Sequence, residues 1–330
     1  MGIEIVHQAD LYARVMRVKF QNKQLSTPIF FPAISSIETK FKVNDLAYLI
    51  ANSAYPQMLI SAYDYNYHLN KNKKLRNIIN EYSRKGNFLL VDSGGYESFW
   101  EKKRKWNFSV YKKTISKINS DFYTSLDGIK ESSHIAEFEK FFRKIISSGS
   151  ILSTSQYIPI FHADSNVKLI NLIKKFLEAY PAALRYIAVR ERECGITISD
   201  RAKTIFKIRT LLTKKGNSQL LHILGAGNPL SIALYSYCGA DSFDSTDWIR
   251  FTLDPERLIL RDLVHLEITE CKCKACAKIS DPLFRTLLHN LNIYSIIMTR
   301  IQKRIQNNSL REFLNQNDIN NSFLNKIVRI

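Results

Sequence analysis

The stretch LHILGAGNPLSIALYSYCGADSFDSTD, residues 221–247, contains the unit from which most of the chain is built. A short apolar run at 221–227 has the composition of a buried strand, and 229–239 has apolar residues at helical spacing and ends at a glycine. A second β-type run follows at 241–247. Strand, helix and strand in direct succession indicate an α/β fold with a parallel sheet.

The same alternation extends toward the N-terminus. Short β-rich runs recur at fairly regular intervals, and segments with helical spacing, such as 199–215, lie between them. The eight runs are PIFFPAI (28–34), QMLISAY (57–63), NFLLVDSG (87–94), DFYTSLDG (121–128), YIPIFHA (157–163), RYIAVRE (185–191), LHILGAG (221–227) and DSFDSTD (241–247). Eight such units predict a (β/α)8 barrel of the TIM type, and a doubly wound open sheet is the alternative.

Polar residues at the ends of these runs favour the barrel. Asp92, Asp127, His162, Glu191 and Asp244 each fall at or near the C-terminal end of a predicted strand. A closed barrel gathers these side chains around one mouth, where barrel active sites lie, whereas an open sheet spreads them along one edge. The aspartates considered singly are equally typical of helix caps and turns.

The pattern changes after about residue 262. We therefore expect a catalytic barrel over residues 1–262 and a small zinc-binding, helical C-terminal subdomain over 263–330. Cys271, Cys273 and Cys276 form C-x-C-x-x-C, and His289 follows thirteen positions later. Three thiolates and one imidazole fill a tetrahedral zinc shell with no open position, so the pattern predicts structural Zn²⁺; incidental surface thiols are the alternative. The isolated Cys194 and Cys238 are expected to be buried.

The charge balance favours a polyanionic partner. The 330 residues include 48 Lys+Arg and 30 Asp+Glu, a formal charge of +18, and 45% are hydrophobic. This composition excludes a disordered chain and makes nucleic acid the leading partner class, although a basic surface also occurs without such a ligand. Candidate contacts, each of which is otherwise a solvated surface, are Lys102, Lys103, Arg104 and Lys105, and Arg300, Lys303 and Arg304.

The sequence does not suggest a membrane protein. No stretch approaches the roughly 18 apolar residues of a spanning helix, and the N-terminus MGIEIVHQAD does not have the form of a signal peptide. We expect a cytoplasmic protein without a membrane partner.

Four segments, in this order along the chain, resemble the tRNA-guanine transglycosylases and their relatives. They are DSGGY (92–96), HILGAGNP (222–229), GADSFDS (239–245) and the C-x-C-x-x-C run followed by LLHN (287–290). LGAGNP and FDS are more similar to archaeosine-type than to bacterial queuosine-type enzymes, and the chain has no room for the RNA-binding domain of archaeal enzymes. The sequence therefore looks most similar to the DNA-guanine transglycosylases of 7-deazaguanine DNA modification systems.

The resemblance implies that guanine in nucleic acid leaves and a 7-deazaguanine base enters, with 7-cyano-7-deazaguanine as the expected base. Asp244 matches the nucleophile that attacks C1′, and Asp92 matches the general acid/base. Asp127 matches the aspartate that binds the purine edge, and Tyr96 matches the aromatic residue that stacks on the base. Further base-binding positions implied by the motifs are Ser93, Gly94, Gly225 and Gly227.

Three residues depart from the family pattern. His162 stands where the family has Gln, and it either bonds the base or is a satisfied barrel histidine. Arg190 and Glu191 stand where the family has a small-residue wall, and they either pair with each other or reshape the pocket for another 7-substituent. A homodimer and a protein partner from a modification system are further expectations.

Other functions fit parts of the sequence. The same base exchange on tRNA uses every one of these catalytic residues. A non-catalytic, zinc-containing nucleic-acid-binding partner subunit would lack the aspartates that are present here. A zinc-dependent barrel hydrolase needs an open metal position, which a Cys3His site does not offer.

Overall fold

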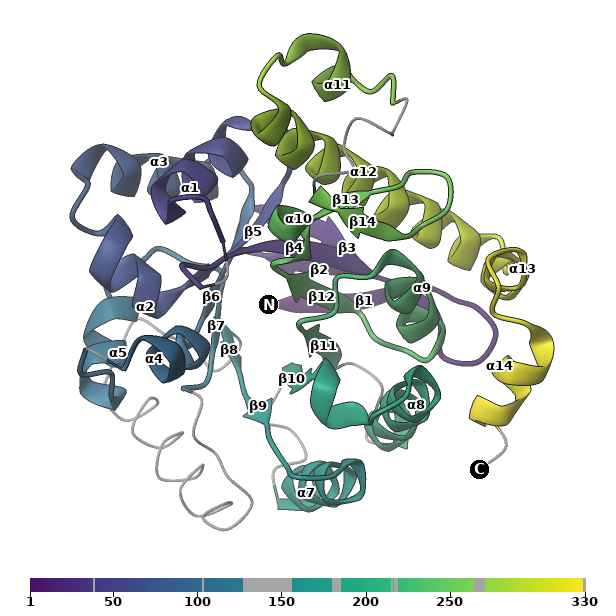
Figure 1. Ribbon diagram of the computed structural model, residues 1–330. Helices are drawn as coiled ribbons and strands as arrows, with labels where there is room; N and C mark the ends of the chain where they lie inside the picture. Colours follow the sequence, from purple (N-terminus) through teal and green to yellow (C-terminus); the bar gives the residue numbers. More distant parts are fainter. Residues whose placement is uncertain are drawn as a thin grey trace.

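A computed structural model describes residues 1–37, 39–102, 104–126, 156–179, 185–214, 216, 219–263 and 271–328. Its centre is a nine-stranded parallel sheet with the order β8-β7-β6-β5-β4-β12-β11-β10-β9 (Figure 1). The strands are β4 (Ile29–Ile34), β5 (Gln57–Ser61), β6 (Phe88–Asp92), β7 (Phe122–Thr124), β8 (Tyr157–Ile158), β9 (Ile160–Phe161), β10 (Tyr186–Arg190), β11 (Leu220–Leu224) and β12 (Ser242–Ser245).

The two ends of this sheet are one stretch of chain. β8 pairs with β7 and β9 pairs with β10, and the single residue between β8 and β9 is Pro159. The strands therefore form a nearly closed parallel barrel, consistent with the TIM type. Each of the eight predicted runs contains strand residues, so the predicted α/β class is confirmed; the last two residues of the run 121–128 lie outside the described residues.

Alternation along the strands separates two cores. Phe31, Leu90 and Ala188 belong to a cluster inside the barrel, whereas Phe30 and Val91 belong to the cluster between strands and helices. Successive side chains on a strand point to opposite faces. The same parity directs Ser61, Asp92, Arg190 and Asp244 inward at the C-terminal ends of their strands.

Helices surround the strands (Figure 1). They are α1 (Val43–Asn52), α3 (Lys73–Arg84), α5 (Phe108–Ile115), α7 (Asn166–Ala179), α8 (Ile198–Lys214) and α9 (Pro229–Tyr237). Asn228 caps α9 by accepting from two backbone N–H groups, and Gly239, just beyond its end, has φ of +99°. The helices expected at 199–215 and 229–239 are thus present, with ends within two residues of the prediction.

Five short helical segments lie near the barrel mouth. They are α2 (Ala62–Asp64), the π-helical turn Tyr65–Leu69, α4 (Gly95–Glu101), the 3-10 turn Glu191–Cys194 and α10 (Asp247–Arg250). Each begins within six residues of the end of a barrel strand, so each belongs to the loops that form barrel active sites.

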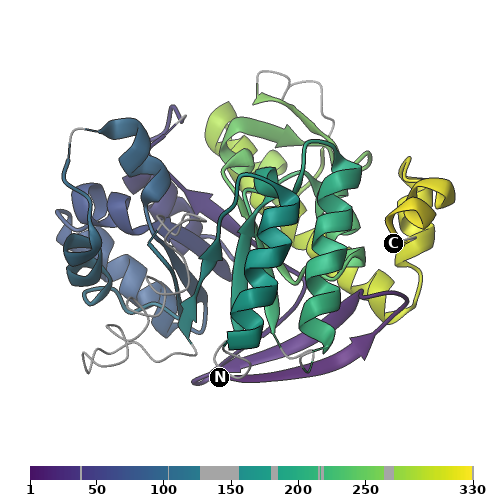
Figure 2. The ribbon, with the colours of Figure 1, turned by 90° about the horizontal axis from the view of Figure 1, so that it is seen from below.

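An antiparallel sheet that the sequence analysis did not predict closes the opposite end of the barrel. It consists of β1 (Gly2–Gln8), β2 (Arg14–Phe20) and β3 (Lys23–Ser26), and Figure 2 shows β1 and β2 crossing beneath the strands. Met16, Val18 and Phe20 are buried in the same cluster as the barrel interior. The sheet therefore seals the apolar barrel floor from water.

A buried ion cluster ties this sheet to the barrel. Arg14 donates two hydrogen bonds to Asp241, at 2.8 and 2.9 Å, and Arg209 donates to Asp241 at 2.5 Å. All three side chains are at most 1% exposed. Burial opposes the charge on Asp241, but the two guanidinium groups outweigh it and lower the pKa of this carboxyl. The buried charges of the cluster are therefore paired with opposite charges inside the protein.

The C-terminal elements pack directly on the barrel. They are β13 (Phe251–Leu253), β14 (Leu260–Asp262), α11 (Lys274–Lys278), α12 (Pro282–Gln306), α13 (Leu310–Gln316) and α14 (Asn321–Val328). Tyr294 of α12 stacks on Phe30 with ring centroids 3.9 Å apart and donates to the Gly227 carbonyl at 2.7 Å. Among the described residues, no helix has the length and apolar character needed to cross a membrane.

Candidate active site and metal centre

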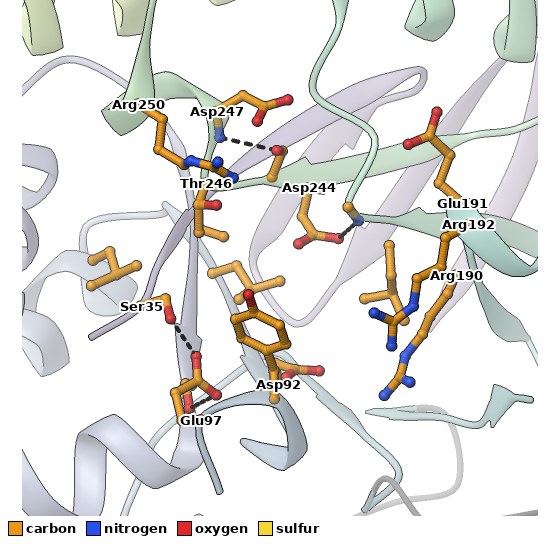
Figure 3. A pocket seen from close by; sticks show the side chains of 18 of the residues that line it. Ser35, Asp92, Glu97, Arg190, Glu191, Arg192, Asp244, Thr246, Asp247 and Arg250 are labelled. Carbon is orange, nitrogen blue, oxygen red and sulfur yellow. Dashed lines mark hydrogen bonds between the residues drawn. The ribbon is translucent and has the colours of Figure 1, made fainter. Parts of the chain in front are cut away.

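A cavity of about 300 Å³ lies at the C-terminal ends of the barrel strands (Figure 3). Its apolar wall includes Ala33, Leu59 and Leu224. Its polar wall consists of Ser35, Ser61, Asp92, Tyr96, Glu97, Arg190, Glu191, Arg192, Gly225, Asp244, Ser245, Thr246, Asp247 and Arg250. A concave site with acids and guanidinium groups above an apolar floor suits a polar, planar ligand.

Asp244 is anchored through one carboxylate oxygen. Its Oδ1 accepts hydrogen bonds from His222 Nε2 at 3.0 Å and from the Gly225 backbone N–H at 3.3 Å. Within the described part of the chain, Oδ2 has no hydrogen-bond partner, and Asp244 is 8% exposed. In Figure 3 the side chain points into the cavity. One oxygen thus fixes the carboxylate while the other can meet a ligand.

A series of buried, hydrogen-bonded side chains extends from Asp244 into the barrel. His222 Nδ1 lies 2.8 Å from Ser242 Oγ, which lies 2.5 Å from the Tyr186 hydroxyl. Because an ionised carboxylate only accepts, His222 donates through Nε2, and its Nδ1 can accept from Ser242 while Ser242 accepts from Tyr186. With every hydrogen bond donated toward Asp244, each of these side chains has a partner, and the carboxylate is held in one orientation.

Asp92 faces the same cavity from β6, which β4 and β5 separate from β12 in the barrel order. Thr124 Oγ1 donates to Asp92 Oδ1 at 2.9 Å, and the Gly94 N–H donates to Oδ2 at 3.3 Å. The carboxyl is therefore oriented by its own strand-end loop and by the neighbouring strand β7. Two oriented carboxyl groups on different strands thus line one cavity.

Glu97 is a third carboxyl in the wall. It is 4% exposed, and its two oxygens lie 2.6 Å from Ser35 Oγ and 2.9 Å from Ser61 Oγ, at hydrogen-bond distance. Burial, followed by the charge of Asp64, raises the pKa of Glu97 to about 8. Glu97 therefore keeps its proton at neutral pH.

Guanidinium groups form the remaining polar wall. Figure 3 shows Arg190 and Arg192 side by side on the edge that β10 contributes. Arg190 lies 3.6 Å from Glu193, and Glu191 accepts from Tyr235 at 2.8 Å and pairs with Arg201 at 3.1 Å. Arg190 and Glu191 thus have separate partners and both contribute to the cavity wall.

The structure separates the predicted base-binding residues into two groups. Tyr96, Arg190, Glu191 and Gly225 line the cavity together with Asp92 and Asp244. Ser93, Gly94, His162 and Gly227 are not among its described lining residues. Asp127 lies outside the described residues, so its position relative to the base site stays a prediction.

Members of the second group contact neighbouring loops. His162 Nδ1 lies 3.1 Å from Glu193. Gly94 has φ of +76°, and a Cβ there would lie 2.5 Å from the Cβ of Tyr63; a Cβ on Gly227 would lie 2.4 Å from Asp247 Oδ2. These glycines are required by close packing of the loops. The contact with Glu193 fits a satisfied barrel histidine, and a bond from His162 to the base stays a prediction.

Sequence reasoning missed several lining residues and one supporting residue. Glu97 and Arg192 belong to no recognised motif, and the resemblance of HILGAGNP to the family implies no role for His222. The alternation in β11 was the available signal, because His222 has the same parity as the inward-facing Leu220 and Leu224.

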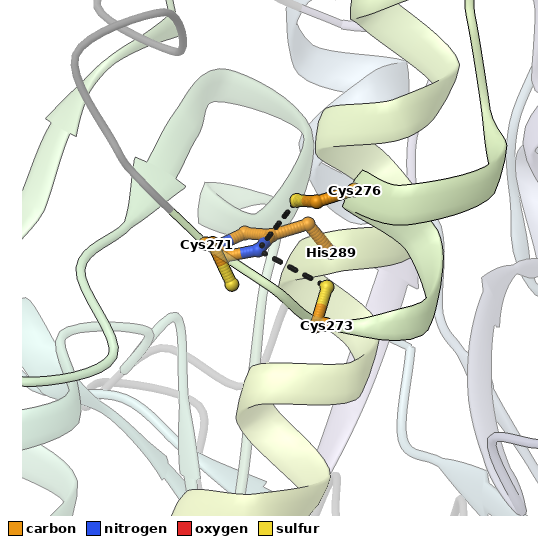
Figure 4. A group of neighbouring side chains, drawn as sticks. All are labelled: Cys271, Cys273, Cys276 and His289. Carbon is orange, nitrogen blue, oxygen red and sulfur yellow. Dashed lines mark hydrogen bonds between the residues drawn. The ribbon is translucent and has the colours of Figure 1, made fainter.

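Cys271, Cys273, Cys276 and His289 form a cluster (Figure 4), and none of the four is among the described residues that line the cavity. Their potential ligand atoms all lie within 4.8 Å of one another. His289 Nδ1 is 3.4 Å from Cys276 Sγ and 3.6 Å from Cys273 Sγ. Ligands of a tetrahedral zinc ion are separated by roughly 3.5–3.8 Å, so these spacings fit one ion.

Two further observations fit a cation. His289 Nε2 lies 2.8 Å from the Leu253 carbonyl, and donation to that oxygen leaves Nδ1 available as a ligand. Burial, together with Cys273, raises the pKa of Cys276 to about 12, whereas burial of Cys273 is outweighed by hydrogen bonds with Cys276 and His289, which lower its pKa to about 6. Three thiols this close can therefore all ionise only when a cation lies between them. The predicted clustering is confirmed, and Cys194 and Cys238 are buried as expected.

The predicted basic contacts occupy two surfaces. Lys102, Arg104 and Lys105 are exposed and follow α4 directly, whereas Lys103 lies outside the described residues. Arg300, Lys303 and Arg304 line a groove on α12. Arg304 also lies over the ring of Phe313 at 5.7 Å, so part of its role is packing.

Three known proteins that are similar to this chain have the same name. No family model matches the sequence. A tRNA-guanine(15) transglycosylase of Sulfolobus acidocaldarius is 22% identical over 347 residues, which cover 94% of this chain and 65% of the relative. Proteins of the same name from Haloferax volcanii and Methanobrevibacter smithii are 30% and 28% identical over 109 and 113 residues, and these matches cover 29% and 30% of this chain.

The chain spans less than two thirds of the length of each of these relatives, with 21% and 17% of the second and third covered. The first match nevertheless extends over nearly the whole of this chain. The matches support a similarity to the tRNA-guanine transglycosylase superfamily, and the parallel barrel and the Cys3His cluster are consistent with that similarity.

Proposed function

We propose that this protein is a pentosyltransferase that exchanges guanine in nucleic acid for a 7-deazaguanine base, with 7-cyano-7-deazaguanine as the incoming base. The observation that carries the proposal is the pair Asp244 and Asp92, each oriented by hydrogen bonds and each lining the same cavity. A base exchange needs one carboxylate to bind the sugar and another carboxyl to handle the proton.

In the first displacement, Asp244 attacks C1′ of the nucleotide. A bond forms between its carboxylate oxygen and C1′ while the bond from C1′ to guanine N9 breaks, and Asp92 gives a proton to the departing base. The bonds from His222 and Gly225 to Oδ1 hold the nucleophile in place without engaging Oδ2. The product is a covalent glycosyl ester of Asp244.

In the second displacement, Asp92 takes the N9 proton from the incoming base. The nitrogen attacks C1′, the ester bond breaks and Asp244 leaves as a carboxylate. Two inversions at C1′ give net retention, as in retaining glycosidases. Tyr96 in the cavity wall is suited to stack on either base, and the target nucleotide must leave its helix to reach the cavity.

The Cys3His cluster would hold Zn²⁺ as a structural ion, because three thiolates and one imidazole complete its shell. The metal would fasten the segment before α12 to that helix and, through the His289 bond to Leu253, to β13. In this proposal, residues 263–330 form the zinc-binding subdomain. The two carboxyl groups of the cavity perform the exchange.

The nucleic acid that serves as substrate is either DNA or tRNA. DNA is the substrate that we infer from the sequence, and the names of the relatives favour tRNA. Incorporation of labelled guanine into tRNA, single-stranded DNA and double-stranded DNA, with Asp244→Ala as the control, tests both. Label in one polymer identifies the substrate, whereas absence of label in all three, with folded and zinc-loaded protein, contradicts the proposal.

A further inference from the structure

Two large aromatic side chains lie exposed next to the cavity. Phe99 and Trp100, at the end of α4, are 63% and 55% exposed. The same helix contributes Tyr96 and Glu97 to the cavity wall. Large apolar side chains exposed together beside a binding site indicate an interaction surface more strongly than single exposed residues do.

The rings continue from the cavity wall to the surface. Tyr96 and Trp100 are four residues apart, so they lie on one face of α4, separated by about 6 Å along its axis. Their ring centroids are 6.3 Å apart with the planes at 72°, and those of Phe99 and Trp100 are 5.4 Å apart with the planes at 85°, so each ring meets its neighbour edge to face. A flat ligand that enters beside Tyr96 therefore has aromatic surface for its neighbour one turn farther out.

Positive charge accompanies these rings. Lys102 lies 5.6 Å from the centroid of Phe99, and the exposed Arg104 and Lys105 follow. The nearest acid of the helix, Glu101, accepts a hydrogen bond from Tyr63 at 2.8 Å. Exposed aromatic rings beside cations are the combination that binds unpaired bases and their phosphates.

This surface is fixed to the catalytic loop. Trp106 donates to the Ser93 carbonyl at 3.0 Å, and Tyr67 donates to the Lys105 carbonyl at 3.1 Å. Arg104 lies 4.6 Å from the centroid of Tyr67. Arg104, Lys105 and Trp106 are therefore held next to Ser93, in the loop that follows β6 and Asp92.

We propose that Phe99 and Trp100 form an aromatic platform for the unpaired nucleobase next to the exchanged nucleotide, in which the base stacks on the face of one ring and meets the edge of the other, with Lys102, Arg104 and Lys105 facing its phosphates. The proposal rests on the proposed function, because that function brings a flipped nucleotide to the cavity. The platform accepts a base of either DNA or RNA, since both have the same aromatic faces.

The test is binding of labelled 12-nucleotide single strands with one central guanine, as DNA and as RNA, measured by fluorescence anisotropy. Each strand is made intact and with abasic neighbours on both sides of the guanine. Phe99→Ala/Trp100→Ala is compared with wild type, with Trp100→Phe as the ring-retaining variant and Tyr48→Ala as the control. Tyr48 is an aromatic residue on α1 that is 52% exposed and is not among the described cavity-lining residues.

We expect the double variant to bind intact strands at least about 5-fold more weakly than wild type, since stacking on one ring gives that much or more. Abasic neighbours should lower the affinity of the wild-type protein by a similar factor but should not change the affinity of the double variant. Trp100→Phe should retain most of the wild-type affinity. Binding by the double variant within 2-fold of wild type, while Asp244→Ala still abolishes exchange, overturns the platform alone. Absence of binding by wild type to every strand overturns both proposals.

Discussion

The hydrogen bond from His222 to Asp244 provides a sharp test of how the nucleophile is held. Replacing His222 with Leu removes the donor at 3.0 Å from Oδ1 and leaves the 3.3 Å bond from Gly225 as the remaining anchor among those described. A hydrogen bond to a charged group contributes about 1.5–3 kcal/mol. If this amount is lost from the transition state, the exchange rate falls by about 10- to 150-fold.

Two variants separate positioning from general damage to the interior. His222→Gln can place an amide donor near the position of Nε2, so it should recover part of the rate. Tyr186→Phe removes the far end of the same series of side chains without touching Asp244, and its rate should stay within about 3-fold of wild type. Thermal melting of each variant shows whether the fold survives.

The assay is incorporation of labelled guanine into the accepted polymer at saturating substrate, with the yield of covalent adduct as a second readout. Both quantities should fall together in His222→Leu, because the bond acts on the nucleophile. A rate within 2-fold of wild type in a folded His222→Leu protein would refute the role that we assign to this bond.

Three further predictions concern stability and charge. Asp241→Asn leaves Arg14 and Arg209 without a buried counter-charge, so urea unfolding should give a free energy of unfolding lower by about 3–5 kcal/mol, and a change below 1 kcal/mol would contradict the buried cluster. Glu97 keeps its proton in the folded protein until about pH 8 but releases it in the unfolded chain near its ordinary pKa of 4.5, so the folded state should lose stability as the pH rises between these values. Glu97→Gln should reduce this loss between pH 5.5 and 8.5, and an unchanged pH dependence would show that Glu97 is not the group responsible. Cys273→Ser should remove bound zinc and lower the melting temperature more than it lowers turnover per folded molecule, whereas unchanged melting with lost turnover would make the metal catalytic.

Most barrel strands were predictable because they contain a short apolar run, although β12 has a single apolar residue, Phe243. The alternation predicted eight runs, and one of them, 157–163, contains two strands, β8 and β9. The N-terminal sheet was not predictable on the same basis. Arg14, Arg17 and Lys19 interrupt β2, and most of β1 is exposed, so the apolar pattern there is weak. The sheet packs through residues such as Met16 and Val18, whose partners belong to barrel strands distant in the sequence.

The candidate site was predictable where a residue lies at the end of a strand. Asp92 and Asp244 were predicted because each falls at the end of a predicted strand and lies in a segment that resembles the transglycosylases. Glu97 follows the same motif but resembles an ordinary acidic residue of a first helical turn. Its environment depends on Ser35 and Ser61, which are 62 and 36 residues earlier in the chain, and no local pattern reports those contacts.

The most direct test of the account is to trap the covalent intermediate. Wild-type protein is incubated with an accepted guanine-containing oligonucleotide without an incoming base, denatured and analysed by intact mass spectrometry and peptide mapping, with Asp244→Ala alongside. We predict a mass equal to the protein plus the oligonucleotide less one guanine, located on the peptide that contains Asp244 and absent from the variant. An adduct on another residue, or base exchange retained by Asp244→Ala, would contradict the account.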